Sequence, residues 1–572
     1  MPRPIPALCI AFLLAWPAQP HAQPEAAPDE GFSPLDEITP ANVKQLVAAF
    51  TFRTGKPRAH TSAPLAVGDV LLVLTPFPHT LFGLDLTQPN APVKWTYAPR
   101  PNHLAEGLTC CGAPTGGIAA QDGRIYLNSL DGQVSALAAA DGKVLWNATV
   151  AHPEAGEILA TAPLPVMDEL IVGTSGDDAG ARGALIALDA SSGGQRWKVF
   201  STGPDNEAGI GESFHPFYRT GDGPDLGVTT WPPAAWQQGG GGLAGPLVFD
   251  PGSGMLFQQT GHPAPLNPDQ REGDNLWTSG LFARDARTGA ATWFDAIDPH
   301  DVHSLGAGGG IILATSQGRP ILIHPDANGY LYELDRTSGE ILSANPYLPV
   351  TATHGVDRAT GRPVRDANFT LTRGSTTRDI CPGWPAGSNA LPAFSPLSGF
   401  AYLPVAQLCM DMQPVSANYI AGTPFAGANV RMKPAAGRSL GALIGWDIAA
   451  RHAAWTLPES LPLRGGALVT GGGLVFYGTL DGFIKAADAR TGTALWQFHT
   501  ASGIVARPIS YRAPDGHQYL AVLAGSGGLT GTNSAQEIDA RDATAAHGLA
   551  AALGPLPTPD DASGVLYVFR LP

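Results

Sequence analysis

The chain has 572 residues, a formal net charge of −15 and no basic cluster, so nucleic acid is an unsuitable partner. An acidic surface serves solubility, and it can also steer a basic redox protein. Glycine (70) and proline (53) are abundant, yet 44% of the residues are apolar. Many turns combined with enough apolar residues for a core predict a protein of many short strands.

The N-terminus has the layout of a secretory signal peptide over residues 1–22. Arg3 precedes an apolar run at residues 7–16, and small and polar residues follow as far as Ala22. No later stretch approaches about 20 uninterrupted apolar residues, so we expect no transmembrane segment. The sequence therefore predicts an exported protein, located in a bacterial periplasm.

Four cysteines remain once the leader is removed, and in an oxidising compartment an even number favours disulfides. Cys110 and Cys111 are adjacent. Neighbouring α-carbons lie ~3.8 Å apart, below the ~4.4–6.8 Å usual for a disulfide, so a bridge between them closes a strained ring. Two reduced thiols, or thiols paired elsewhere, are the alternatives. The chain has no Cys-x-x-Cys-His motif, and we expect no c-type haem.

A repeat of strand, turn and tryptophan runs along the chain. Three clear copies end at Trp197, Trp293 and Trp496, and in each an apolar strand ending in Asp leads through a glycine to the tryptophan. Trp95, Trp146 and Trp197 are spaced by 51 residues, and wider gaps near 96 and 112 residues look like two units each. Units of this length cannot bury both of their faces alone, and they stack radially as propeller blades.

We therefore predict an all-β protein, an eight-bladed β-propeller, with seven blades as the alternative. Residues 38–572 form one domain, after a flexible N-terminal segment at 23–37 and with a loop excursion at 533–564. The strand at Val565–Leu571 stands alone at the C-terminus, so the two ends of the chain are expected to complete one blade together. The recurring tryptophans are expected to fill the space between blades.

Several ordered motifs make the chain resemble the PQQ-dependent alcohol dehydrogenases of methanol and ethanol type, and the resemblance covers almost the whole mature chain. These motifs are Cys110-Cys111, Val172–Gly176, Thr260–Pro265, Gly273–Thr278, Pro299–Asp301, His324–Asp326, Leu408–Asp411 and Phe476–Gly482. The resemblance implies an eight-bladed quinoprotein propeller that oxidises a small alcohol. In the haem-free, soluble branch that the chain resembles, electrons leave through a separate cytochrome c.

The same resemblance implies the cofactors and the disulfides. PQQ is held with calcium or a lanthanide, and the vicinal ring Cys110–Cys111 lies against one face of the quinone. A second bridge corresponds to Cys381–Cys409. Asp178 falls at the position of the metal-binding glutamate, and Arg464 lies in Leu463–Gly466, a segment expected to face the cofactor.

The residues at other functional positions depart from the family's pattern. Ser304 stands where the family has its aspartate base, and His262 replaces the metal-binding asparagine. Gly239–Gly242 is followed by Leu243 and Ala244, where the family has a tryptophan under the quinone. Contacts to the cofactor's edge are also replaced, by Thr61, Gly116, Ala160, Ala327 and Ala406. Losing several charged hydrogen bonds, each typically ~1.5–3 kcal/mol, predicts weakened PQQ binding and reduced standard activity.

Three functions therefore compete at this stage. The first is a divergent quinoprotein dehydrogenase with PQQ held by unfamiliar contacts such as Arg464. The second is a rewired copper or zinc site built on His262 and Asp178, which His303 or His60 could approach. The third is a non-catalytic propeller, a pseudoenzyme that binds a ligand or protein partner.

Overall fold

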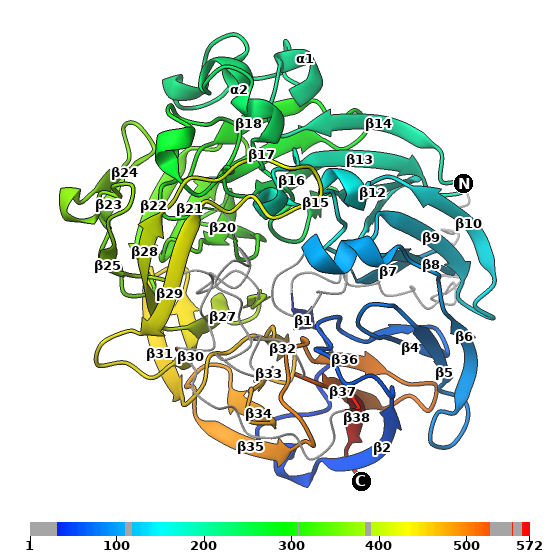
Figure 1. Cartoon of the computed structure of the whole chain (residues 1–572). Coiled ribbons are helices and arrows are strands. Elements are labelled where there is room, and N and C mark those ends of the chain that lie inside the picture. The colour runs from blue at the N-terminus through cyan, green and yellow to red at the C-terminus, as the bar shows by residue number, and fades with distance from the viewer. Residues whose placement is uncertain (1–30, 109–116, 307, 384–389, 527–551, 553–562) are drawn as a thin grey trace, which may run out of the picture.

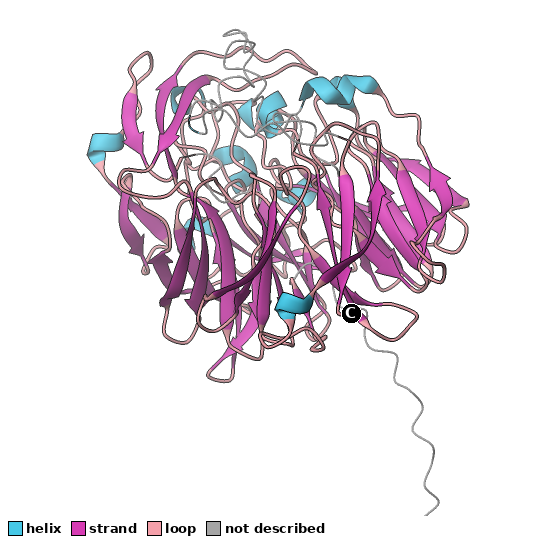
Figure 2. Ribbon diagram, turned by 90° about the horizontal axis from the view of Figure 1, so that it is seen from below, coloured by secondary structure: helices cyan, strands magenta, loops and turns pink. Residues whose placement is uncertain are grey.

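A computed structural model of the chain describes residues 31–108, 117–306, 308–383, 390–526, 552 and 563–572. The protein is an all-β propeller, as predicted: sheets follow one another round a ring, and most are built from strands that are consecutive or nearly so in the chain (Figure 1). Loops and short helices form a layer over one end of the strands (Figure 2).

Five sheets of four strands form in chain order from the N-terminal half. The first comprises β3 (Leu65–Val67), β4 (Val70–Leu74), β5 (Leu81–Asp85) and β6 (Val93–Tyr97). The second comprises β7 (Ile118–Gln121), β8 (Arg124–Asn128), β9 (Gln133–Ala138) and β10 (Val144–Thr149). The third comprises β11 (Leu164–Val166), β12 (Glu169–Gly173), β13 (Ala184–Asp189) and β14 (Gln195–Phe200). The fourth comprises β15 (Val248–Asp250), β16 (Met255–Thr260), β17 (Gly280–Asp285) and β18 (Ala291–Asp295). The fifth comprises β19 (Ile312–Ser316), β20 (Arg319–Pro325), β21 (Tyr330–Asp335) and β22 (Ile341–Pro346).

Three further sheets continue the ring. One comprises β26 (Ala393–Ser395), β27 (Phe400–Ala406), β30 (Gly441–Asp447) and β31 (His452–Glu459). The next has five strands, β1 (Phe32–Ser33), β32 (Leu468–Thr470), β33 (Leu474–Gly478), β34 (Phe483–Asp488) and β35 (Ala494–His499). The last comprises β2 (Val47–Arg53), β36 (Ile509–Arg512), β37 (Gln518–Ala524) and β38 (Val565–Arg570).

The two ends of the chain meet in the last of these sheets. β2 pairs antiparallel with β38, with Val47 opposite Arg570 and Arg53 opposite Val565. The prediction that the termini complete one blade is confirmed. Pairing β2 from the N-terminal part of the chain with the C-terminal strand β38 closes the ring.

The N-terminal segment differs from the prediction of a flexible stretch over 23–37. Phe32 and Ser33 form β1, which runs parallel to β32. Leu35 and Ile38 are buried, and Ile38 donates its N–H to Gln518 Oε1 at 2.9 Å. Apolar side chains at these positions gain more from burial than the segment loses by ordering, so residues 31–37 belong to the propeller.

Side chains that alternate along the strands fill the spaces between neighbouring sheets. In β8, Ile125 and Leu127 pack in a cluster with Leu72 of the first sheet, whereas Tyr126 packs with Val172 of the third. Successive side chains of a strand point to opposite faces, so an inner strand that is buried on both faces must be apolar throughout. The core is therefore distributed round the ring between sheets.

Five of the repeated tryptophans each rest on a glycine of the next sheet. The pairs are Trp95 with Gly142, Trp146 with Gly193, Trp197 with Gly289, Trp293 with Gly339 and Trp455 with Gly492. In every pair a side chain at the glycine would collide with the ring, since a Cβ atom would lie 2.5–2.7 Å from it. The indole N–H of Trp95 donates to Ala139 O at 3.1 Å, and Trp146 bonds to Ala190 O in the same way. The tryptophans thus join adjacent blades, as predicted.

Substituting alanine at one of these glycines is expected to loosen a blade interface. Gly289 and Gly123 both have φ of +72°, but only Gly289 faces a tryptophan, whereas nothing lies within 4 Å of a Cβ at Gly123. Both substitutions incur the strain of a left-handed alanine. Gly289→Ala adds the displacement of Trp197, so we expect it to lower the free energy of unfolding by about 1–3 kcal/mol more than Gly123→Ala. Thermal and urea unfolding measure this difference, and equal losses would contradict the interface role.

The wide gaps between repeats are excursions and not pairs of units, so that prediction is wrong. Segment 201–247 carries α1 (Asp205–Ala208), η5 (Arg219–Gly221), α2 (Leu226–Thr229) and η6 (Ala235–Gln238) and adds no strand to the ring. After β22, the hairpin of β23 (Thr353–Asp357) and β24 (Arg362–Arg365) precedes a sheet of β25 (Thr377–Ile380), β28 (Leu408–Pro414) and β29 (Ala428–Pro434). These strands pair with one another and lie outside the blades.

A disulfide joins Cys381 to Cys409, as the family resemblance implies. It ties the residue after β25 to the neighbouring strand β28. Cys110 and Cys111 lie outside the described residues, as does most of the predicted excursion at 533–564. Among the helices that the structure describes, none has the length and apolar character needed to cross a membrane.

Candidate functional site

Four loops converge at one end of the ring and form the candidate site. They are η4 (Asp177–Ala179), the glycine run at 239–242, the end of β16 with His262, and the loop after β18. Backbone hydrogen bonds connect three of them: Gly261 N–H donates to Gly242 O at 2.7 Å, Ser279 N–H to Gly261 O at 2.8 Å, and Asp298 N–H of the loop after β18 to Ser279 O at 3.1 Å. We call these loops the hub.

His262 and Asp178 form a pair at the hub, with 3.4 Å between Nε2 and Oδ1. The two side chains are 12% and 26% exposed, so water screens them only in part. Burial opposes protonation of His262, but the hydrogen bond to Asp178 and the charges of Asp178, Asp177 and Asp301 outweigh it and raise the pKa to about 9. The imidazole is therefore a cation at neutral pH, and it neutralises Asp178.

Asp177 is a hub residue that sequence reasoning missed, because two adjacent aspartates left open which one faces the site. Gly242 N–H donates to Asp177 Oδ1 at 2.5 Å. A Cβ atom at Gly261 would lie 2.0 Å from Oδ2, so only glycine fits there. Burial raises the pKa of Asp177 to about 6, against the opposing effects of His262 and the Gly242 N–H. The glycine run thus allows the backbone to hold this carboxylate closely.

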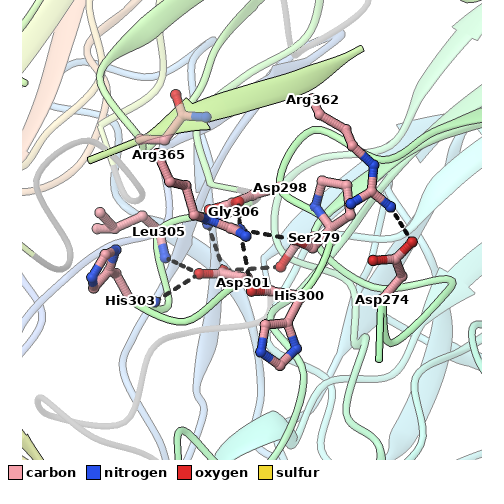
Figure 3. A network of polar contacts seen from close by, with 12 residues as sticks. Asp274, Ser279, Asp298, His300, Asp301, His303, Leu305, Gly306, Arg362 and Arg365 are labelled. Atoms are coloured by element: carbon pink, nitrogen blue, oxygen red, sulfur yellow. Dashed lines mark hydrogen bonds and ion pairs between the residues drawn. The ribbon is translucent and has the colours of Figure 1, made fainter. Parts of the chain in front are cut away.

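Asp301 organises the loop after β18 (Figure 3). Its carboxylate is fully buried and accepts hydrogen bonds from four donors. These are Ser279 Oγ at 3.0 Å, and the N–H groups of His303 at 3.1 Å, Leu305 at 3.2 Å and Gly306 at 2.7 Å. Burial alone would raise its pKa, but these N–H groups and the charges of Arg271 and His262 hold it below the ordinary value. Because all four hydrogen bonds hold the loop, the Asp301 carboxylate has a structural role.

Two arginines of β24 hold the hub from its outer side, one at the loop after β18 and the other at the loop between β16 and β17. Arg365 is paired with Asp298, and its guanidinium also donates to Pro299 O at 2.8 Å (Figure 3). Arg362 is paired with Asp274. Burial raises the pKa of Asp298 to about 7, although Arg365 opposes this. The hairpin β23–β24 therefore anchors the hub from outside the ring, a contact between excursions that no sequence pattern indicated.

Ser304, the residue at the position of the family's base, is buried and has φ of +56°. Among the described residues its hydroxyl oxygen has no hydrogen-bond partner. No carboxylate therefore activates the hydroxyl, and an unassisted serine is a poor base at neutral pH.

His60 and His303 are held by other partners and do not join His262. His60 is fully buried, with Nε2 at 2.8 Å from Thr54 Oγ1 and Nδ1 at 2.7 Å from Arg58 O, and burial lowers its pKa to about 4. His303 Nε2 lies 3.0 Å from Phe369 O. In the part of the chain that the structure describes, no group of three or more His, Cys, Asp or Glu side chains could hold a metal. The predicted approach of His60 or His303 to a copper or zinc site is therefore not seen.

The other predicted positions are small residues that are buried or partly buried, a buried arginine, and residues outside the description. Ala327 and Ala406 are buried, and Ala406 belongs to an apolar cluster with Leu408 and Met410. Ala244 N–H donates to Gln259 O at 3.2 Å. Arg464 is buried in the segment between β31 and β32. Gly116 lies with Cys110 and Cys111 outside the described residues.

Comparison with known proteins decides the family. A family model described as "Glucose/ethanol/alcohol dehydrogenase, beta-propeller domain", of the PQQ type, matches residues 23–382 and 445–520. The chain belongs to the PQQ-dependent alcohol dehydrogenase family. A lanthanide-dependent methanol dehydrogenase of Methylacidiphilum fumariolicum (strain SolV) is 38% identical over 94% of this chain and 90% of its own.

Two other members of the family are similar over nearly the same length. The methanol dehydrogenase (cytochrome c) subunit 1 of Paracoccus denitrificans is 36% identical, covering 95% of this chain and 88% of its own. A solved structure of a europium-containing methanol dehydrogenase superposes with a TM-score of 0.90 at 36% identity, covering 95% of this chain and 96% of that one. The quinoprotein propeller is thus shared along nearly the whole chain.

Proposed function

We propose that this protein is an exported quinoprotein-type propeller whose metal-assisted oxidation of alcohols is strongly reduced by the rebuilt hub. The observation that carries the proposal is the pair of His262 and Asp178, 3.4 Å apart. In a PQQ-dependent alcohol dehydrogenase these positions serve the metal. Here they form an ion pair with each other, and the proposal follows from that internal pairing.

The donor set does not fit calcium or a lanthanide. Such hard cations take six or more oxygen ligands, whereas His262 offers a nitrogen that is protonated at neutral pH. A cationic imidazole repels a metal ion and competes with it for Asp178. Of the two other carboxylates at the hub, Asp177 accepts the Gly242 N–H and Asp301 already accepts four hydrogen bonds. We therefore derive no reaction step through a bound metal.

The carboxylate that would remove the proton from an alcohol is also missing. Ser304 replaces the family's aspartate, and among the described residues its hydroxyl oxygen has no partner that would activate it. General-base catalysis typically contributes 10²–10⁴-fold to a rate. Its loss supports a strong reduction in turnover even if PQQ binds.

Any residual activity would be the reaction of the family, the oxidation of an alcohol by PQQ. PQQ supplies a quinone that takes the electrons of the alcohol, and Arg464 with Cys110 and Cys111 would hold it. A small alcohol is the proposed substrate, and a soluble cytochrome c is the proposed acceptor, as the name of the Paracoccus denitrificans relative indicates. The leader at residues 1–22 supports placing this chemistry in the periplasm.

Reconstitution of the purified protein tests the proposal. The full chain is incubated with PQQ and calcium, europium, copper or zinc, and desalted. Retained quinone is read by absorbance, metal content by mass spectrometry, and turnover by methanol- or ethanol-dependent dye reduction. We expect well under one calcium or europium ion per chain and little alcohol-dependent reduction. One PQQ and one europium ion per chain, with ready dye reduction, would refute the proposal.

A second candidate is a non-catalytic propeller that binds a ligand or protein partner. Its support is that small side chains, Ala327 and Ala406, are buried where the family grips the cofactor, and that Ala406 packs against Leu408. A hub closed by apolar packing needs no cofactor. Failure to retain PQQ with any of the four metals would favour this candidate over residual oxidation.

A further inference from the structure

A methionine occupies the turn between β11 and β12 of the third blade, at the opposite end of these strands from the hub. The turn has two residues, Met167 and Asp168. Met167 has φ of +55° and is 42% exposed. The hub residue Asp178 follows the other end of β12, whose five residues extend over roughly 17 Å. Met167 therefore lies well outside the hub.

Folding does not explain a methionine at this position. The first residue of the turn has a positive φ, a conformation that favours Gly, Asn or Asp. The matching two-residue turns of three other blades carry Gly68, Asp122 and Gln317, with φ of +54°, +51° and +51°. Met167 is thus the one large apolar side chain among these four positions, and it gains little from burial. A residue that breaks a local rule without a gain for the fold indicates a functional role.

The sulfur of Met167 contacts a guanidinium of the fourth blade. Arg287 Nη2 lies 3.4 Å from Met167 Sδ, and Arg287 is itself exposed. On the other side of the turn, Gln121 Nε2–H donates to the Met167 carbonyl at 2.9 Å. These two contacts hold the sulfur at the surface, where a small oxidant in solution can reach it.

The other methionines of the chain are less accessible. Of the six, Met1 lies in the predicted leader and Met255 is partly buried. The remaining three are at most 1% exposed: Met410, Met412 and Met432. A buried thioether meets an oxidant only when the structure around it opens locally. Met167 is therefore the methionine whose sulfur meets an oxidant in the folded protein.

We propose that Met167 is the site at which hydrogen peroxide modifies this protein, and that Arg287 holds the sulfoxide product. The sulfur attacks one peroxide oxygen: the S–O bond forms, the O–O bond breaks, and the second oxygen leaves with both protons as water. The sulfur is oxidised by two electrons, and the peroxide is reduced. A thioether sulfur is a weak hydrogen-bond acceptor, whereas the polar sulfoxide oxygen takes a charge-assisted hydrogen bond from the guanidinium. Oxidation thus strengthens a contact between the third and fourth blades and leaves the hub unchanged.

Peptide mass spectrometry after timed exposure to hydrogen peroxide tests the site on the full chain. We expect Met167 to gain one oxygen at least about tenfold faster than Met255, and the three buried methionines to react more slowly still, because they need local opening. In urea the rates should converge. Met167→Leu should remove the fast step, whereas Met255→Leu, the matched control, should keep it. If Met255 or a buried methionine reacts as fast as Met167 in the folded protein, the proposal is wrong.

The rates on the wild type decide the site even if a variant fails to fold, and a structure of the oxidised protein decides the role of Arg287. A crystal of peroxide-treated protein should show the Met167 sulfoxide oxygen within hydrogen-bond distance of Arg287 Nη2. A methionine sulfoxide reductase should restore the thioether, since this oxidation is reversible. A sulfoxide oxygen turned away from Arg287 into solvent would overturn the second half of the proposal.

Discussion

Asp301→Ala should lower the free energy of unfolding by about 3–5 kcal/mol, the range typical of breaking a buried charged network. The substitution removes the acceptor of four hydrogen bonds and strands Ser279 Oγ and three backbone N–H groups in a buried loop. It also removes the negative charge near Arg271, which is 0% exposed. Urea unfolding followed by tryptophan fluorescence measures the loss.

Asp285→Ala is the matched control for this prediction. Asp285 Oδ1 also accepts several hydrogen bonds, from the N–H groups of Arg287 and Thr288 at 3.0 Å and from Thr288 Oγ1 at 2.9 Å, but its turn is exposed. Water can replace these bonds, so the expected loss is about 1 kcal/mol. If the two variants lose the same free energy of unfolding, burial does not explain why the Asp301 network stabilises the protein.

The pH dependence of the Asp301 network has a definite sign. Its pKa is lower in the folded protein than in the unfolded chain. Its contribution to the free energy of unfolding is therefore fully present above the pKa of an aspartate in the unfolded chain, about 3.9. It is lost as the pH falls through the lower pKa of Asp301 in the folded protein. The stability difference between the wild type and Asp301→Asn should be constant near neutral pH and narrow in acid. A difference that widens in acid would contradict the network.

The ring of blades could be predicted from the sequence because its interfaces leave a local signature. A tryptophan ring such as Trp197 needs a residue without Cβ opposite it, so the glycine and tryptophan recur at fixed places in each unit. The excursions leave no such signature, because β28 and β29 pair with each other and repeat nothing. The prediction used spacing alone, and it therefore interpreted two long gaps between repeats as pairs of blades.

The candidate site could be predicted only in part. The resemblance located His262 and Asp178, and the structure brings them into contact. Asp177 was missed because which of two adjacent aspartates meets the glycine run depends on the backbone of η4.

Restoring the family's two metal residues together with its base aspartate should create metal affinity at the hub. The triple variant Asp178→Glu, His262→Asn and Ser304→Asp exchanges a cationic imidazole for an amide oxygen and adds one carboxylate. Hard trivalent cations bind more tightly as the number of anionic oxygen ligands rises. We expect the triple variant to bind europium at least about 100-fold more tightly than the wild type, equivalent to two tenfold steps of about 1.4 kcal/mol. Europium luminescence on titration measures this without any need for turnover.

The double variant Asp178→Glu and Ser304→Asp separates the role of His262 from that of added carboxylates. It gains the same acidic groups but keeps the imidazole, whose pKa of about 9 leaves it charged at neutral pH. The retained cation should go on pairing with the acid at position 178 and repelling the metal. We therefore expect most of the gain in europium affinity to need His262→Asn. If the double variant binds as tightly as the triple variant, the imidazole does not stand in for the metal, and the reduced metal chemistry of this hub must come from its missing carboxylate alone.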